Sequence, residues 1–132
     1  MEKKSNPLSG HPRLLFTEKE IERLRQELSS EKQLMDQFTE FEAKAASLMD
    51  SSLYSEEYAN SIYSQHGRFY EIGAQLTAYA ERLGFLYQVT GKEKYALKIK
   101  EALLHYASFA AWTGPANRGM DACGICYGAL LL

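Results

Sequence analysis

The chain has 132 residues, a net charge of -2 and 45% hydrophobic residues, a composition typical of folded globular chains and not of disordered ones. Its Lys and Arg residues form no basic stripe, so we expect no nucleic-acid partner. Its apolar stretches fall far short of the roughly 20 residues that span a bilayer, and no apolar stretch follows the basic start "MEKK", so we expect no membrane span and no signal peptide.

Residues 1–10 show no periodicity and are expected to form a flexible lead. In the following stretch, Thr17 and Glu20 have the spacing of a capping box, which predicts a first helix from about Glu18 to Leu28. After an interruption at two serines, a second amphipathic helix is predicted. Its apolar face is expected to consist of Leu34, Phe38, Phe41, Ala45, Leu48 and Met49.

The stretch from Asp50 to Gln65 is rich in Ser and Tyr and shows no sustained period, so we expect a loop with one short helical turn around Glu56 to Ile62. Unstructured stretches of this length are uncommon inside compact domains and are often functional. This loop is therefore a candidate lining of a site.

Two further helices are predicted as an antiparallel hairpin, because only a few residues join them. The first begins at about Phe69 and ends at Gly91, a residue suited to a left-handed C-cap. On the second, we expect Lys94, Lys98 and Glu101 on the solvent side and a buried apolar stripe formed by Tyr95, Ile99, Ala102, Tyr106 and Phe109. No strand-like alternation is found, so the predicted fold class is all-α.

The final segment, "DACGICYGALLL", contains Cys123-x-x-Cys126, the spacing of redox dithiols and of half a zinc site. A redox pair normally follows a strand, and none is predicted here. Zinc would need four close ligands, whereas the histidines are scattered at His11, His66 and His105. We therefore interpret the cysteines, together with Tyr127 and Leu130, as residues of a core helix packed tightly against its neighbours. We expect neither a metal nor another cofactor.

Polar residues precede two of the predicted helices, where free backbone N–H groups favour an anion. His66, Arg68 and Tyr70 come before the third helix and form a candidate site for an acidic sugar. The residues alone favour a structural ion pair for Arg68 and a solvated turn position for His66. The second candidate group, before the last helix, is Asn117, Arg118 and Asp121.

The stretches "HPRLLFTEKEIERLRQEL" and "RFYEIGAQLTAYAERLGFLYQVTGKEKYALKIKEALLHYASFAAW" resemble the toroid domain of heparinase II/III-type polysaccharide lyases and related alginate lyases. The resemblance covers residues 11 to about 112. It implies that residues 11–132 are the truncated N-terminal portion of an incomplete (α/α) toroid built from antiparallel helical hairpins. It also implies an acidic polysaccharide or oligosaccharide as partner, cleavage of uronic-acid glycans by β-elimination, and a periplasmic or secreted location.

The catalytic residues of such lyases belong to later parts of the domain, and no motif here matches them. We therefore expect this segment to be inactive by itself, with its two candidate helix N-termini lining the substrate groove. Because the chain ends on "GALLL", we also expect the last helix to lack covering neighbours and to permit self-association. Two alternatives stay open, a self-contained helical interaction module and a toroid glycoside hydrolase.

Overall fold

The computed structural model describes residues 15–63, 66–112 and 120–131. Within these ranges the chain is mostly helical, as predicted, and one very small sheet is present. The elements in chain order are α1 (Glu18–Ser30), α2 (Lys32–Met49), α3 (Glu56–Asn60), β1 (Ile62–Tyr63), β2 (His66–Gly67), α4 (Phe69–Ala78), the π-helical η1 (Tyr79–Gly84), α5 (Phe85–Thr90), α6 (Glu93–Ala107) and α7 (Met120–Leu131).

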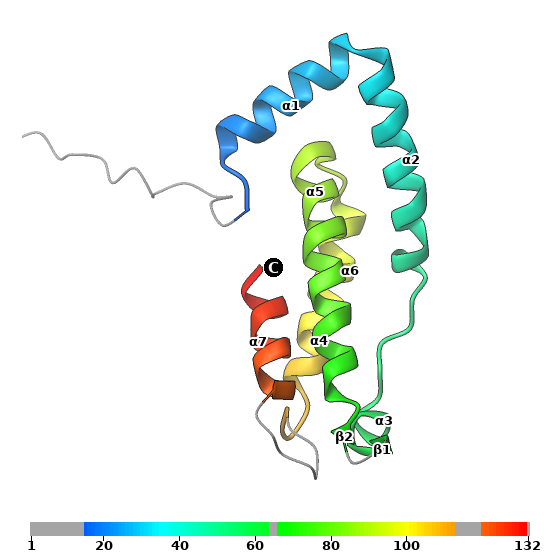
Figure 1. The fold of residues 1–132 in the computed structure, drawn as a ribbon, viewed down its shortest axis with the longest axis vertical. Helices are drawn as coiled ribbons and strands as arrows, with labels where there is room; N and C mark the ends of the chain where they lie inside the picture. The colour runs from blue at the N-terminus through cyan, green and yellow to red at the C-terminus, as the bar shows by residue number, and fades with distance from the viewer. Residues whose placement is uncertain (1–14, 64–65, 113–119, 132) are drawn as a thin grey trace, which may run out of the picture.

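The long axis of the molecule is one continuous rod formed by α4, η1 and α5 (Figure 1). In this view α2 runs along one side of the rod and α7 along the other, while α1 crosses over its upper end (Figure 1). The second half of the helical hairpin, α6, packs against η1 and α5. The predicted antiparallel hairpin is therefore confirmed.

The predicted start of α1 is also confirmed. Thr17 Oγ1 accepts a hydrogen bond from Glu20 N at 3.3 Å, and Glu20 Oε2 accepts one from Thr17 N at 2.7 Å. The helix continues to Ser30, past the predicted end, and the hydroxyls of Ser29 and Ser30 donate to the carbonyl of Gln26 within the helix. The break before α2 falls at Glu31 and not at the serines.

Gly91 ends α5 as predicted, with a left-handed φ of 68° and its N–H donating to Tyr87 O at 2.8 Å. The same rod contains a feature that the periodicity did not predict. Between Tyr79 and Gly84 the helix widens into a π-helical stretch.

The sheet was not predicted, since β1 and β2 have two residues each and are too short to show an alternating pattern. They pair antiparallel, with Ile62 opposite Gly67 and Tyr63 opposite His66. The short helix predicted in the preceding loop is present as α3.

The core lies between the rod, α6 and the inner face of α2, and its largest fully buried side chains include Tyr79, Tyr95 and Tyr106. On α6 the expected apolar stripe is confirmed, but the prediction that Lys98 faces solvent is wrong. Its side chain is only 12% exposed, because Nζ reaches inward to donate to Ser51 O at 2.9 Å. The long aliphatic stem of a lysine makes this burial possible.

The expected packing of α7 is corrected in part. Ile125 and Gly128, three residues apart on one helix face, lie buried against the rod, whereas Cys126 is exposed and Tyr127 is 56% exposed. Consecutive residues of a helix point in different directions, so Cys126 and Tyr127 turn away from α4. The side chains of Cys123 and Leu130 lie outside the described residues.

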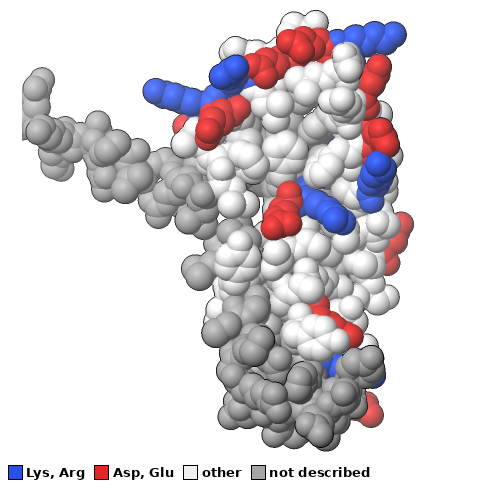
Figure 2. All heavy atoms as spheres, viewed as in Figure 1, with Lys and Arg blue, Asp and Glu red and all other residues white. Residues whose placement is uncertain are grey.

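Charged side chains gather over α1 and along the outer edge of α2, while the face over the rod is largely uncharged (Figure 2). Within the described ranges, no helix combines the length and the apolar composition needed to cross a lipid bilayer.

Candidate functional site

A polar cluster lies where α3 meets the first turn of α4. We call it the Tyr–Arg cluster and define it as Tyr54, Tyr58, Arg68 and Glu71. Arg68 Nη1 donates to Tyr58 Oη at 2.8 Å and lies 3.8 Å from Glu71 Oε1, and its Cζ is 4.8 Å from the centroid of the Tyr58 ring. The guanidinium is thus held by two side chains, by the hydroxyl and ring face of Tyr58 and by the carboxylate of Glu71.

Both charged side chains of the Tyr–Arg cluster are partly buried, with Arg68 26% and Glu71 22% exposed. The backbone supports this position, since Arg68 N donates to Ala59 O at 3.2 Å and so joins the end of α3 to the start of α4. Partial burial strengthens the attraction between opposite charges relative to a fully solvated pair. The cluster is therefore an ordered feature and not a loose surface pair.

The two tyrosines of the cluster form a stack, with ring centroids 5.2 Å apart and an angle of 11° between the planes. A hydrogen bond with Glu71 raises the pKa of the Tyr58 phenol, and Arg68 opposes that rise. Burial, followed by the negative charge of Glu71, raises the pKa of Tyr54. Both phenols therefore stay protonated at neutral pH.

The residues predicted before the third helix are placed as follows. Arg68 is the N-cap residue of α4, and its contact with Glu71 agrees with the ion pair that the residues alone favoured. Tyr70 lies two residues after Arg68, within α4, and is 47% exposed. His66 belongs to β2, and its side chain lies outside the described residues.

The second predicted group is not brought into a described site. Asn117 and Arg118 lie outside the described residues, and Asp121 belongs to α7 with an undescribed side chain. Tyr54 and Tyr58 were missed by sequence reasoning, because only the fold brings the loop after α2 next to Arg68. The signal that could have located Tyr58 is Ser55, which caps α3 by accepting from Tyr58 N at 3.1 Å.

The loop between α2 and α3 is fixed by side chains from the rod and from α6. Gln75 Nε2 donates to Ser52 O at 3.0 Å, and the hydroxyls of Ser51 and Tyr79 are 2.5 Å apart. Lys98 holds the same loop from α6. Residues 50–55, the first part of the long stretch that was a candidate lining of a site, are therefore held in place next to the Tyr–Arg cluster.

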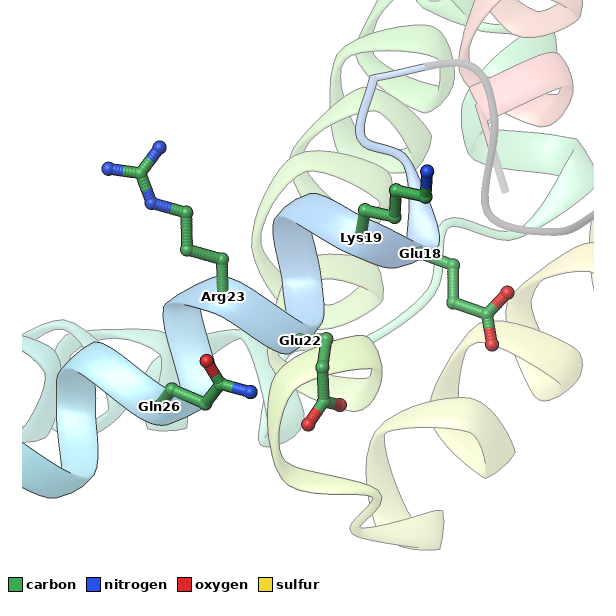
Figure 3. A pocket seen from close by; sticks show the side chains of 5 residues that line it. All are labelled: Glu18, Lys19, Glu22, Arg23 and Gln26. Atoms are coloured by element: carbon green, nitrogen blue, oxygen red, sulfur yellow. The ribbon is translucent and has the colours of Figure 1, made fainter.

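A shallow depression elsewhere on the surface is lined by side chains of α1 alone (Figure 3). These side chains are Glu18, Lys19, Glu22, Arg23 and Gln26. All are exposed, and they point in different directions and do not converge on one point (Figure 3). The depression is the solvated face of an amphipathic helix.

In the part of the chain that the structure describes, no group of three or more His, Cys, Asp or Glu side chains is arranged to hold a metal ion. Comparison of the chain with protein-family models, with curated proteins and with solved structures finds no match.

Proposed function

We propose that this chain is the N-terminal segment of a polysaccharide lyase that cleaves a uronic-acid-containing glycan by β-elimination. In this proposal the helical hairpins are part of an incomplete (α/α) toroid, and the enzyme is periplasmic or secreted. The antiparallel pairing of the rod with α6, followed by the return of α7 along α4, supports the toroid because toroids are built from such pairs.

The observation that carries the proposal is the position of Arg68 in the Tyr–Arg cluster, with the exposed Tyr70 two residues further along the chain. A guanidinium offers planar paired donors that match a carboxylate, the group that distinguishes a uronic acid from a neutral sugar. An exposed tyrosine combines an apolar ring with a hydroxyl, which suits the two kinds of surface on a sugar. The cluster would thus hold an acidic sugar at one end of the groove.

In β-elimination, a base removes the proton next to the sugar carboxylate, and a cation or donor neutralises that carboxylate so that the proton becomes acidic enough to leave. The phenols of the Tyr–Arg cluster have raised pKa values and do not suit the role of the base. The proposal therefore assigns the cluster to binding. It places the base in a part of the enzyme outside this chain and expects no turnover by the 132 residues alone.

The test measures binding of uronate oligosaccharides to the chain by calorimetry and compares two variants. Arg68→Gln should weaken binding by roughly 10-fold or more, because a hydrogen bond to a charged group contributes about 1.5–3 kcal/mol. The matched control is Arg23→Gln, which removes an α1 arginine whose side chain is 79% exposed and which should leave affinity unchanged. Equal affinity for neutral oligosaccharides, or no effect of Arg68→Gln, would contradict the binding role.

The expected lack of turnover is tested by incubating the chain with alginate and glycosaminoglycans and measuring the absorbance of the unsaturated product. No product is expected from this chain, and turnover would show that catalytic groups are present within it.

A self-contained helical interaction module is the second candidate, and one observation favours it. Leu97 and Leu104 are 61% and 63% exposed and lie two turns apart on the same face of α6. The double variant Leu97→Lys/Leu104→Lys tests this candidate by analytical ultracentrifugation. A dimer that the two lysines convert to a monomer would favour the module, whereas a monomer in both cases would count against self-association.

A further inference from the structure

Both backbone polar groups of Tyr54 are held by two consecutive residues of α6. Tyr106 Oη accepts a hydrogen bond from Tyr54 N at 3.0 Å, and His105 Nε2 lies 2.7 Å from Tyr54 O. A carbonyl oxygen can only accept, so the His105 ring nitrogen is the donor. Residue 54 is thereby fixed at its N–H and at its C=O.

His105 is itself held in place by aromatic neighbours. Its ring centroid is 5.0 Å from that of Tyr106 and 5.2 Å from that of Phe109, in edge-to-face arrangements. The His105 ring is therefore packed among aromatic side chains. The hydrogen bond to Tyr54 also connects His105 to the Tyr–Arg cluster, because Tyr54 belongs to that cluster.

Tyr54 in turn contacts the other residues of the Tyr–Arg cluster. Its ring stacks on that of Tyr58, and the Tyr58 hydroxyl accepts from Arg68 Nη1. The residue after Tyr54 is the N-cap of α3, so the backbone position of Tyr54 also sets where α3 begins. A second link, between α3 and the segment after α6, is made by Glu56 Oε1, which accepts from Ala110 N at 2.7 Å.

We infer that His105 is a positioning residue for Arg68. By holding the carbonyl of Tyr54, it fixes the ring on which Tyr58 stacks, and so it keeps the Tyr58 hydroxyl where it accepts from the guanidinium. This inference rests on the proposed function and extends it. His105 does not touch the sugar but orients the arginine that binds it.

The test uses two substitutions that separate the ring of His105 from its donor. His105→Phe keeps an aromatic ring against Tyr106 and Phe109 and removes the hydrogen bond to Tyr54. His105→Gln loses the ring and keeps an N–H donor at about the same distance from the backbone. The readouts are the NMR signals of the Tyr58 ring and of the Arg68 Nε–Hε group.

The expected result is that these signals move in His105→Phe and return toward their wild-type positions in His105→Gln. Arg25→Met is the matched control, since Arg25 also donates to backbone carbonyls, those of Gln88 and Val89, but from α1. It should lower stability without moving the Tyr58 and Arg68 signals. If His105→Phe does not fold, His105→Met takes its place, because methionine fills irregular space and carries no donor.

Unchanged Tyr58 and Arg68 signals in the donor-free variant would overturn the inference. So would equal shifts in His105→Phe, His105→Gln and Arg25→Met, because they would show a general response to lost stability. Affinity for uronate oligosaccharides supplies a separate readout, with a loss of about tenfold expected for His105→Phe and recovery in His105→Gln. If the wild-type chain binds no uronate, the proposed function fails while the NMR comparison still decides the role of His105.

Discussion

Gly128 of α7 lies directly against Leu76 of α4. A Cβ built on Gly128 would be 2.7 Å from Leu76 Cβ and 2.9 Å from Thr77 N, distances that real Cβ atoms do not tolerate. The absence of a side chain at residue 128 therefore allows the close approach of the two helices. This contact is the largest between any two elements of the described chain.

We predict that Gly128→Ala destabilises the protein by about 1–3 kcal/mol, because the new methyl group must push α7 away from the α4 backbone. The measurement is the free energy of unfolding in urea. Gly84→Ala is the matched control, since its Cβ would meet only Tyr79 O at 3.8 Å. In a helix interior that change should be neutral or should stabilise by up to about 1 kcal/mol. Equal effects at both positions would contradict the close-packing argument.

Removing the Tyr106 hydroxyl should cost about 1–3 kcal/mol of stability, because it leaves polar groups in the core without a partner. This hydroxyl donates to Gln75 Oε1 and accepts from Tyr54 N. Tyr106→Phe should therefore lower the urea midpoint of unfolding. Tyr127→Phe makes the same chemical change at a side chain that is 56% exposed and should have no measurable effect. A midpoint that is the same for both variants would show that the hydroxyl of Tyr106 is not needed.

Stability should fall at alkaline pH as two buried phenols ionise. Burial raises the pKa of Tyr106 to about 12, and burial, aided by the carboxylate of Glu42, raises the pKa of Tyr95 to about 12. These folded-state pKa values exceed the unfolded-state pKa of about 10. The protonated phenols therefore contribute their full stabilisation below pH of about 10, and this contribution is lost as the pH rises toward about 12.

The measurement is the free energy of unfolding as a function of pH, with ultraviolet absorbance to follow phenol ionisation. Tyr95→Phe should reduce the alkaline loss of stability, and Glu42→Gln should reduce it less, since burial is the larger cause of the Tyr95 shift. A wild-type stability that is constant between pH of about 10 and 12 would refute the prediction.

Cys126 should react with alkylating reagents in the native protein, because its side chain is exposed on α7. In a Cys123→Ser variant it is the single thiol, since the chain contains 2 cysteines. Mass spectrometry should show that it labels in native buffer about as fast as after unfolding in urea. Labelling only after unfolding would restore the interpretation of a packed, inaccessible cysteine.

Local sequence patterns determined much of the secondary structure. The capping box at Thr17, the left-handed position of Gly91 and the apolar stripe through Tyr95 and Tyr106 act over a few residues, so short-range spacing was enough to predict them.

The candidate site depended on contacts between residues far apart in the chain. Arg68 was identified as a candidate from its place before a helix, but its partner Tyr58 comes from another element, and His105 reaches Tyr54 across 51 positions of sequence. Lys98 was misassigned to solvent because its hydrogen-bond partner, Ser51 O, is a backbone atom that no residue pattern reveals. Periodicity determines which face of a helix is apolar, whereas only the packing of helices against the loop after α2 determines which polar side chains meet.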